Sequence, residues 1–260
     1  CYMSVILGEV QRRASELGVG VYGFRNTGGV HGLSPWVLPL ARAGVFGIFA
    51  WNGGSYTTVP FGSTEPFFGT NPLAYAIPME NGEPVVADFA TSQIPFMNLR
   101  RAHQSGIELP PDAGMDPEGQ PTTSAAVVYG SSTDGFARLR PMGGGPKGSA
   151  LMLLVEVLTG ALVGAKMGRA ATDDPFIPEE FGGLLIGLSL ERFGVADTFR
   201  QEAQRLADDI RNSKPARGVN RVQLPGDGER ERQMKRLEDG SLELDDALLD
   251  RLRKLASRRS

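Results

Sequence analysis

Helical and strand-like patterns alternate over the first part of the chain, and this alternation limits the folds open to it. Apolar residues recur at helical spacing from Val5 to Leu17, and Gly18 follows as a stop signal. Val19 to Phe24 then alternates like a strand. A helix over Ser34 to Ala43 and a short buried strand over Val45 to Ala50 come next. The order helix, strand, helix, strand predicts an α/β protein.

The rest of the chain continues with both kinds of element. Strands are expected over Leu73 to Ile77 and Val85 to Phe89, joined by an Asn81-Gly82 turn. Ser34 and Asp197 are the expected N-caps of their helices. The further helices are predicted over Ser92 to Gln104, Lys147 to Val163, Asp197 to Asn212, Gly228 to Leu237 and Asp245 to Leu255, and the further strands over Gly182 to Leu190 and Val219 to Leu224.

The composition excludes several classes of protein. The chain is 41% hydrophobic and 22% charged with a net charge of −3, and its basic residues are dispersed, which argues against a nucleic-acid surface. The longest apolar run, from Ala150 to Val163, contains Glu156, Thr159 and Gly160, which favours a buried helix over a membrane span. With Cys1 as its one cysteine and two histidines, the sequence offers no internal disulfide and no zinc constellation, so we expect a reducing cytoplasm.

The usual nucleotide-binding motifs are missing. No G-x-G-x-x-G fingerprint stands between a strand and a helix, and there is no P-loop. The stretch MGGGPKG, residues 142–148, is the alternative device. Its glycines leave backbone N–H groups accessible at the start of a helix, and Lys147 adds a positive charge there, which suits a phosphate. A glycine-rich turn with a solvated lysine explains the stretch equally well.

Other candidate site residues each have an ordinary structural alternative. Asp88 ends an apolar strand in PVVADFATS, where a carboxylate either caps a helix or belongs to a site. His31 lies in a glycine-rich loop, where it either transfers a proton or is polar surface, whereas His103 beside two arginines is expected to be surface. Thr70 and Asn71 in GTNP suit a turn or the lining of a pocket.

Several stretches, in this order, resemble one known family. GFRNTGGVHG, GIFAWN, PFGSTEPFFGTNPLAYAIP, VVADFATS, MDPEGQPTTS and LRPMGGGPKGSALMLLVEVLTGAL together resemble the malate/L-lactate dehydrogenase family of the non-Rossmann type, over nearly the whole chain. That resemblance implies an α/β fold with a mixed sheet and surrounding helices. It also implies an NAD(P)-binding and catalytic core over residues 1–225, with a C-terminal helical segment over residues 226–260 packing back on the core.

The resemblance also implies a homodimer and hydride transfer with NADPH or NADH. The expected cofactor-binding residues are Asn52, Gly53, Asp88, Phe89, Ala90, Thr91, Lys147, Gly148, Asp227 and Gly228. The expected substrate contacts are Arg25, Asn26, Thr70 and Asn71, with a structural salt bridge as the alternative for Arg25. His31 is the candidate proton donor, and Asp88 is expected to orient a donor or the nicotinamide amide.

The resemblance also bears on the reaction. GGVHGLSPWVLPLA is most similar to the branch that reduces delta-1-piperideine-2-carboxylate and delta-1-pyrroline-2-carboxylate, so we expect a reductase of a small cyclic 2-imino acid. The alternatives are a 2-hydroxy acid dehydrogenase of the malate, lactate or sulfolactate type and a catalytically inactive dimeric relative. We expect a small carboxylate as partner, and no metal, nucleic acid or membrane.

The start of the chain affects the catalytic assignment. The family's N-terminal helical region, with a Ser-His-Gly motif whose histidine is often the proposed proton donor, precedes Cys1, so we expect a fragment or a processed product. That upstream histidine is the rival of His31.

Overall fold

A computed structural model describes residues 2–52, 56–130, 137–171, 180–241, 244 and 246–257 of the chain. The helices are α1 (Tyr2–Leu17), α2 (Ser34–Arg42), α3 (Phe96–Ser105), α4 (Ala125–Tyr129), α5 (Pro146–Thr159), α6 (Ala196–Arg211), α7 (Asp227–Asp239) and α8 (Asp246–Ala256). The strands are β1 (Val19–Thr27), β2 (Val45–Trp51), β3 (Leu73–Ile77), β4 (Val85–Phe89), β5 (Gly114–Met115), β6 (Pro121–Thr122) and β7 (Phe181–Ser189). Short 3-10 turns lie at Met142–Gly144, Ala161–Val163 and Gly168–Ala170.

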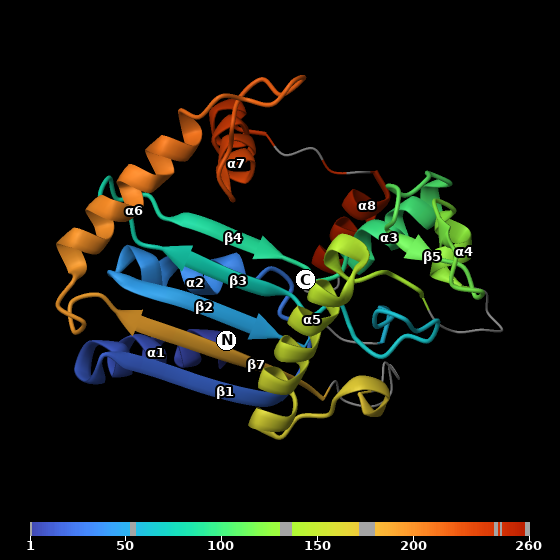
Figure 1. Cartoon of the computed structure of the whole chain (residues 1–260), viewed down its shortest axis with the longest axis horizontal. Coiled ribbons are helices and arrows are strands. Elements are labelled where there is room, and N and C mark those ends of the chain that lie inside the picture. Colours follow the sequence, from blue (N-terminus) through green and yellow to red (C-terminus); the bar gives the residue numbers. More distant parts are fainter. Residues whose placement is uncertain are drawn as a thin grey trace.

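A sheet in the order β1-β7-β2-β3-β4 forms the centre of the molecule (Figure 1). Each neighbouring pair is antiparallel, so the expected α/β class is confirmed, whereas the expected mixed pairing is wrong. The reason is the position of β7. Helix α2 returns the chain so that β1 and β2 run in the same direction, as in a β-α-β unit. Strand β7 then inserts between them in the opposite direction and replaces the parallel contact with two antiparallel ones.

Helices cover both faces of the sheet (Figure 1). α1 and α2 pack on one face, where Val10, Leu40 and Phe49 are fully buried in the main hydrophobic cluster. The close approach of α1 requires glycine in β1, because a Cβ on Gly20 would lie 2.1 Å from the Val10 carbonyl oxygen. α5 crosses the other face just as closely, and a Cβ on Gly182 would lie 2.0 Å from the carbonyl oxygen of Thr159.

Helix α5 is less buried than its sequence predicted. Met152 and Val155 pack inward, but Leu153 and Leu154 are each 53% exposed and Val157 is 43% exposed. One side of the helix packs on the sheet and the other presents an apolar surface. By length and composition alone, residues 146–163 are apolar enough to cross a membrane, with 33% of the segment buried here; core helices of soluble proteins also pass that test.

Several predicted boundaries differ from the structure. Ser34 and Asp197 are not N-caps, because each lies in the first turn of its helix and the caps, Leu33 and Val195, make no side-chain hydrogen bond. α3 begins after Pro95, whose extended backbone ends the preceding segment. The strand expected over Val219 to Leu224 is absent from this described segment, because the Leu224 N–H turns to Asp227 instead of a sheet.

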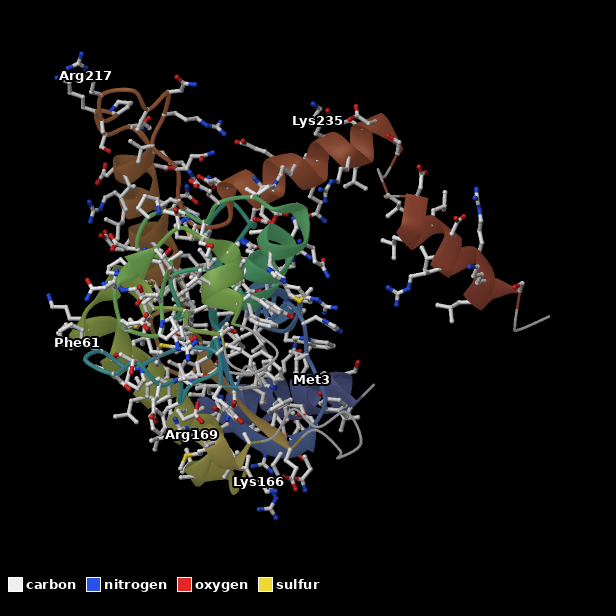
Figure 2. All side chains as sticks on the ribbon, turned by 90° about the vertical axis from the view of Figure 1, so that its right-hand side faces the viewer. Met3, Phe61, Lys166, Arg169, Arg217 and Lys235 are labelled. Atoms are coloured by element: carbon white, nitrogen blue, oxygen red, sulfur yellow. The ribbon has the colours of Figure 1, made fainter. Side chains whose placement is uncertain are left out.

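The last helices leave the sheet. The loop before α7 touches β4, since a Cβ on Gly226 would lie 2.6 Å from the Val86 carbonyl oxygen. Figure 2 shows α7 and α8 extending outward from the rest of the molecule. Whether residues 1–225 and 226–260 form the expected core and attached helical segment stays a prediction.

Candidate functional site

Three loop segments meet where β4 ends. Thr91 follows β4, and its N–H donates to the Thr70 carbonyl oxygen at 2.9 Å while its hydroxyl donates to the Asn71 carbonyl oxygen at 2.8 Å. The Met142 N–H donates to the Thr91 carbonyl oxygen at 2.8 Å. Asn71 and Thr91 are fully buried, and Asn71 has a left-handed backbone with φ of 41°. The structure thus brings the GTNP turn, the segment after β4 and the glycine-rich turn into contact.

A buried glutamate lies directly beneath the GTNP turn. One carboxylate oxygen of Glu156 accepts from the Asn71 Nδ2 at 2.7 Å, and the other accepts from the Gly168 N–H at 2.7 Å and more weakly from the Asn52 Nδ2 at 3.4 Å. Glu156 is 4% exposed. Sequence reasoning missed its role and treated it as an interruption of an apolar run. The available signal was a lone acid inside an otherwise apolar helix, which requires a buried partner.

The donors to Glu156 are neutral. Burial raises the pKa of the Glu156 carboxyl above its ordinary value, while the N–H donors of Gly168, Asn71 and Asn52 act in the opposite direction. In the described part of the chain no lysine or arginine forms an ion pair with this carboxylate. The described residues also hold no group of three His, Cys, Asp or Glu side chains placed to bind a metal ion.

Asp88 occupies the other side of β4, at the start of α2. Its Oδ2 accepts from the backbone N–H groups of Leu33 and Ser34, both at 2.8 Å. Free N–H groups at a helix N-terminus need such an acceptor, so Asp88 caps α2 from a strand 54 residues away in sequence. Capping was one of the two roles predicted for Asp88. The structure shows that it caps a helix, but this helix is α2, which precedes Asp88 in the sequence, rather than the helix that follows it.

A pocket of about 470 Å³ opens beside Asp88. Its walls come from the start and end of α2, from β4 and from the first turns of α7. Gly32 and Ser34 line it near Asp88, and the charged residues on the remaining walls are Arg42, Glu83, Arg211, Asp227, Glu229 and Arg230. Two residues from separate parts of the expected cofactor set, Asp88 and Asp227, therefore lie in one pocket.

Asp227 is held by an arginine. The Arg211 guanidinium donates to both carboxylate oxygens at 2.8 and 3.2 Å, and the Leu224 N–H donates to Oδ2 at 2.9 Å. The hydrogen bond with Arg211 lowers the pKa of Asp227, and the same contact raises that of Arg211. Gly228 is partly buried next to Asp227 in the first turn of α7.

Lys147 and Gly148 lie at the start of α5, after the glycine-rich turn. Lys147 is exposed and does not line the Asp88 pocket. Close packing requires glycine at position 148, because a Cβ there would lie 2.1 Å from the Met142 carbonyl oxygen. α2 and α5 cover opposite faces of the sheet (Figure 1), and Asp88 contacts the start of α2. That Asp88 and Lys147 both contact one cofactor stays a prediction.

The remaining candidates are more dispersed. His31 and Asn26 are exposed in left-handed backbone conformations, with φ of 62° and 57°. Arg25 donates to the Gly164 carbonyl oxygen at 3.3 Å, a structural contact at the far edge of the sheet. Phe89 and Ala90 are half-buried at the end of β4, and Gly53 lies outside the described residues.

Comparisons with known proteins agree with this fold. The chain is 32% identical to ureidoglycolate dehydrogenase (NAD(+)) of Escherichia coli K12 over 90% of its length and 65% of the relative. It is 40% identical to delta(1)-pyrroline-2-carboxylate reductase 1 of Burkholderia ambifaria over 53% of its length and 38% of the relative. The sulfolactate dehydrogenase structure from Methanocaldococcus jannaschii superposes with a TM-score of 0.86 at 28% identity, covering 98% of this chain and 71% of that one.

The chain spans less than two thirds of the length of these two curated relatives. The family model for malate/L-lactate dehydrogenase matches residues 3–253, which is nearly the whole chain. The matched region includes the GTNP turn, the Asp88 strand, the glycine-rich turn and α7. The chain belongs to the malate/L-lactate dehydrogenase family.

Proposed function

We propose that this chain carries the nicotinamide-binding and substrate-binding parts of a reductase that acts on a small cyclic 2-imino acid of the piperideine- or pyrroline-2-carboxylate type. Family membership supports the oxidoreductase class. The higher identity of the imine reductase relative, 40% over 137 residues, supports the substrate class. In the net reaction a hydride adds to the imine carbon and a proton to the imine nitrogen, which gives a cyclic amino acid.

The observation that carries the proposal is the pocket shared by Asp88 and the loop before α7. Its volume of about 470 Å³ is in the range of small-molecule sites. Asp88 already accepts from the N–H groups of Leu33 and Ser34, so these N–H groups are not available to a phosphate. A phosphate in this pocket therefore needs cationic side chains. Arg42 and Arg230 line the pocket, and the one ion pair of Arg42 among the described residues is a 3.8 Å contact. Arg42 and Arg230 therefore supply the cations for a ligand that carries phosphates, beside the carboxylates of Glu83, Asp88, Asp227 and Glu229 in the same pocket.

The chain's own residues then have separate tasks. A nicotinamide cofactor supplies the hydride when it is bound. Asp88 fixes the start of α2, and with it the loop that carries His31. Thr70 and Asn71 present the substrate-binding turn, which Thr91 holds against the end of β4. His31 is the proposed proton donor within this chain.

Cofactor binding is the first test. The protein is titrated with NADPH and, separately, with NADH, and nicotinamide fluorescence is followed. We expect saturable binding of at least one of the two. Arg42→Ala, on the wall of the pocket, should weaken it, whereas Arg217→Ala, in the exposed loop before α7, serves as a matched control that removes one arginine elsewhere. A protein that binds neither nucleotide would refute the oxidoreductase proposal.

Turnover then distinguishes imine from ketone reduction. Oxidation of the reduced nucleotide is measured with pyrroline-2-carboxylate, oxaloacetate and pyruvate as substrates. We expect the imine to have the highest kcat/KM. A preference for a 2-oxo acid would instead select the 2-hydroxy acid dehydrogenase alternative, which the 32% identity to ureidoglycolate dehydrogenase over 90% of the chain supports.

The two histidines provide a matched test of the proton donor. His31→Ala should lower kcat by roughly 10²-fold or more if His31 donates the proton. His103→Ala is the control, because His103 stacks on Tyr129 at 4.4 Å between ring centroids, beside α4. Unchanged turnover in His31→Ala would exclude His31 as the proton donor.

We also propose that the protein acts as a homodimer in the cytoplasm. The exposed apolar surface of α5, with Leu153, Leu154 and Val157, supports self-association because such surfaces often mark interfaces. Sedimentation of the wild type and of Leu153→Asp tests the dimer. A wild-type chain that sediments as a monomer at micromolar concentration would contradict it.

A further inference from the structure

Glu156 connects segments that are distant in the sequence. Its carboxylate accepts from Asn71 in the turn before β3, from Gly168 in the turn after α5 and from Asn52 at the end of β2. The two 2.7 Å hydrogen bonds, to Asn71 and Gly168, are the short ones. Its donors Asn71 and Asn52 also bind backbone carbonyls, those of Met152 and Lys166. The carboxylate therefore fixes the position of the GTNP turn relative to α5.

The same contacts lead on to the proposed site. Asn71 receives the hydroxyl of Thr91 on its carbonyl oxygen, and Thr91 in turn receives the N–H of Met142. A continuous chain of hydrogen bonds thus runs from the middle of α5, through the substrate-binding turn, to the glycine-rich turn at the start of the same helix. Removing the acceptor at Glu156 leaves the Asn71 side chain, at the centre of this chain, with only its longer 3.2 Å hydrogen bond to the Met152 carbonyl among the described residues.

The backbone conformation of Asn71 explains why its side chain has to be held by hydrogen bonds. Its φ of 41° lies in the left-handed region, which non-glycine residues adopt only when surrounding contacts favour it. The side chain of Asn71 is fully buried, and both of its Nδ2 contacts go to α5, one to Glu156 and one to the Met152 carbonyl. Thr70, the preceding residue, is half-buried, and its position depends on the backbone conformation of Asn71.

We propose that Glu156 is a positioning residue that holds the Thr70–Asn71 turn in the geometry required for substrate binding. The inference rests on the proposed reductase function and adds a residue that has no contact with the Asp88 pocket. Its action is indirect, because the carboxylate is buried beneath the turn. The same carboxylate holds the turn at Gly168, which lies between Lys166 and Arg169 in the sequence, through the Gly168 N–H at 2.7 Å.

The test compares Glu156→Gln with Thr159→Val. Glutamine keeps the volume but replaces one carboxylate oxygen with an NH₂ group, which cannot accept. Either the Asn71 side chain or the Gly168 N–H therefore loses its acceptor at position 156. Thr159 lies on the same helix and is equally buried, and its hydroxyl donates within α5, to the Val155 carbonyl. Melting curves show that both variants fold, nicotinamide fluorescence gives cofactor affinity, and steady-state kinetics with pyrroline-2-carboxylate give kcat and KM.

For Glu156→Gln we expect cofactor affinity within about twofold of wild type and kcat/KM for the substrate lowered by roughly tenfold or more, because small misplacements are costly in catalysis. Thr159→Val should retain both. Equal kcat/KM in Glu156→Gln and wild type would overturn the inference, and so would a parallel loss in Thr159→Val.

Two further outcomes are covered. If Glu156→Gln does not fold, Thr91→Val replaces it, because this change keeps the volume and removes the hydroxyl donations to the carbonyls of Asn71 at 2.8 Å and Thr70 at 3.3 Å, which hold the same turn. Wild-type kcat/KM in Thr91→Val would then overturn the inference, and a tenfold loss with intact cofactor binding would support it. A wild-type chain that binds neither nucleotide refutes the proposed function itself, whereas turnover that is indifferent to Glu156 refutes only the positioning role.

Discussion

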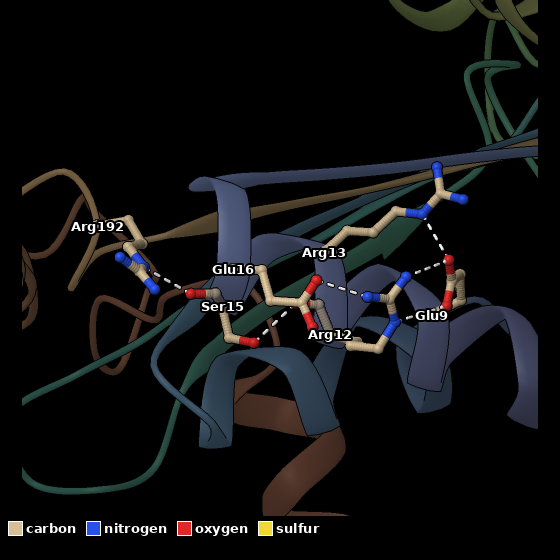
Figure 3. A network of polar contacts seen from close by, with 6 residues as sticks. All are labelled: Glu9, Arg12, Arg13, Ser15, Glu16 and Arg192. Atoms are coloured by element: carbon tan, nitrogen blue, oxygen red, sulfur yellow. Dashed lines mark hydrogen bonds and ion pairs between the residues drawn. The ribbon is translucent and has the colours of Figure 1, made fainter.

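Two glutamates of this chain show how differently one side chain behaves at the surface and in the interior. Glu9 lies on α1, where Arg12 donates to it at 2.9 Å and Arg13 at 2.6 Å in a surface network with Glu16 (Figure 3). Glu156 has no arginine or lysine partner among the described residues and is satisfied by neutral N–H groups. The half-buried surface glutamate has two cationic partners, and the fully buried one has none among the described residues.

The consequences for charge are opposite in sign. Hydrogen bonds from Arg12 and Arg13 lower the pKa of Glu9 to about 2, whereas burial raises the pKa of Glu156. The partners of Glu9 are three and four residues away in one helix, but those of Glu156 are up to 104 residues away. The surface network therefore changes a pKa without organising the fold, while the buried carboxylate determines how distant segments meet.

The largest expected effect follows from removing a donor to the buried carboxylate. Asn71→Ala leaves one oxygen of Glu156 without its 2.7 Å donor in a site that water does not reach. Leaving a buried carboxylate oxygen without its donor costs about 3 kcal/mol of the free energy of unfolding. Urea denaturation followed by circular dichroism measures this change.

A matched control separates the contribution of the hydrogen bond to Glu156 from the contribution of left-handed backbone strain. Asn26 also has positive φ, 57°, but is exposed, so Asn26→Ala should cost only about 1 kcal/mol for left-handed strain. If the two alanine variants lose the same stability, the hydrogen bond to Glu156 contributes nothing beyond backbone strain, and the contrast between the buried glutamate and the surface one loses its basis.

The next effect concerns the cap that crosses from β4 to α2. Asp88→Ala removes the acceptor for the Leu33 and Ser34 N–H groups, and loss of a cap costs about 1–2 kcal/mol. Asp88→Asn keeps an acceptor oxygen and should lose less than the alanine variant. Thermal melting of both variants gives the order, and an asparagine variant as unstable as the alanine one would contradict the capping role.

The ion pair between Asp227 and Arg211 is partly buried, and its contribution to stability should depend on pH. Because Arg211 lowers its pKa, the pair's stabilisation is fully present above the unfolded value of 3.8 and is lost as pH falls through the lower folded value. Asp227→Asn should lose about 1 kcal/mol at pH 7 and show a weaker loss of stability on acidification below pH 3.8. Urea midpoints measured at several pH values check this, and an unchanged acid slope would rule out the pair as its source.

Local sequence signals predicted part of the architecture well. The bounds of β3 and β4 match the structure, because their alternating pattern and the Asn81-Gly82 turn between them are short-range features. The α/β class and the family also follow from the order of elements and motifs. The antiparallel sheet did not follow, because β7 pairs with strands more than 130 residues earlier, and no local pattern specifies that insertion.

The candidate site was predicted in its pieces rather than in its arrangement. Asn52, Asn71 and Thr91 were each expected to line a site, and the structure joins them around one buried cluster. Glu156 was missed because an acid in an apolar helix has no distinguishing spacing until its distant donors are known. The separation of Lys147 from the Asp88 pocket was equally hidden, since it depends on which face of the sheet each helix covers.

The smallest expected effect returns to Glu9. Glu9→Gln removes both short ion pairs on α1, yet exposed pairs are screened by water and salt and contribute little to folding. We expect its melting temperature at pH 7 to equal that of wild type within error, with Glu16→Gln as a second surface variant. A clear loss for Glu9→Gln alone would mean that the α1 network also supports the Arg192 contact to the Ser15 carbonyl, which joins α1 to the turn after β7 (Figure 3). In that case the surface glutamate, like the buried one, would connect separate segments of the fold, and Arg192→Ala should reproduce the same loss.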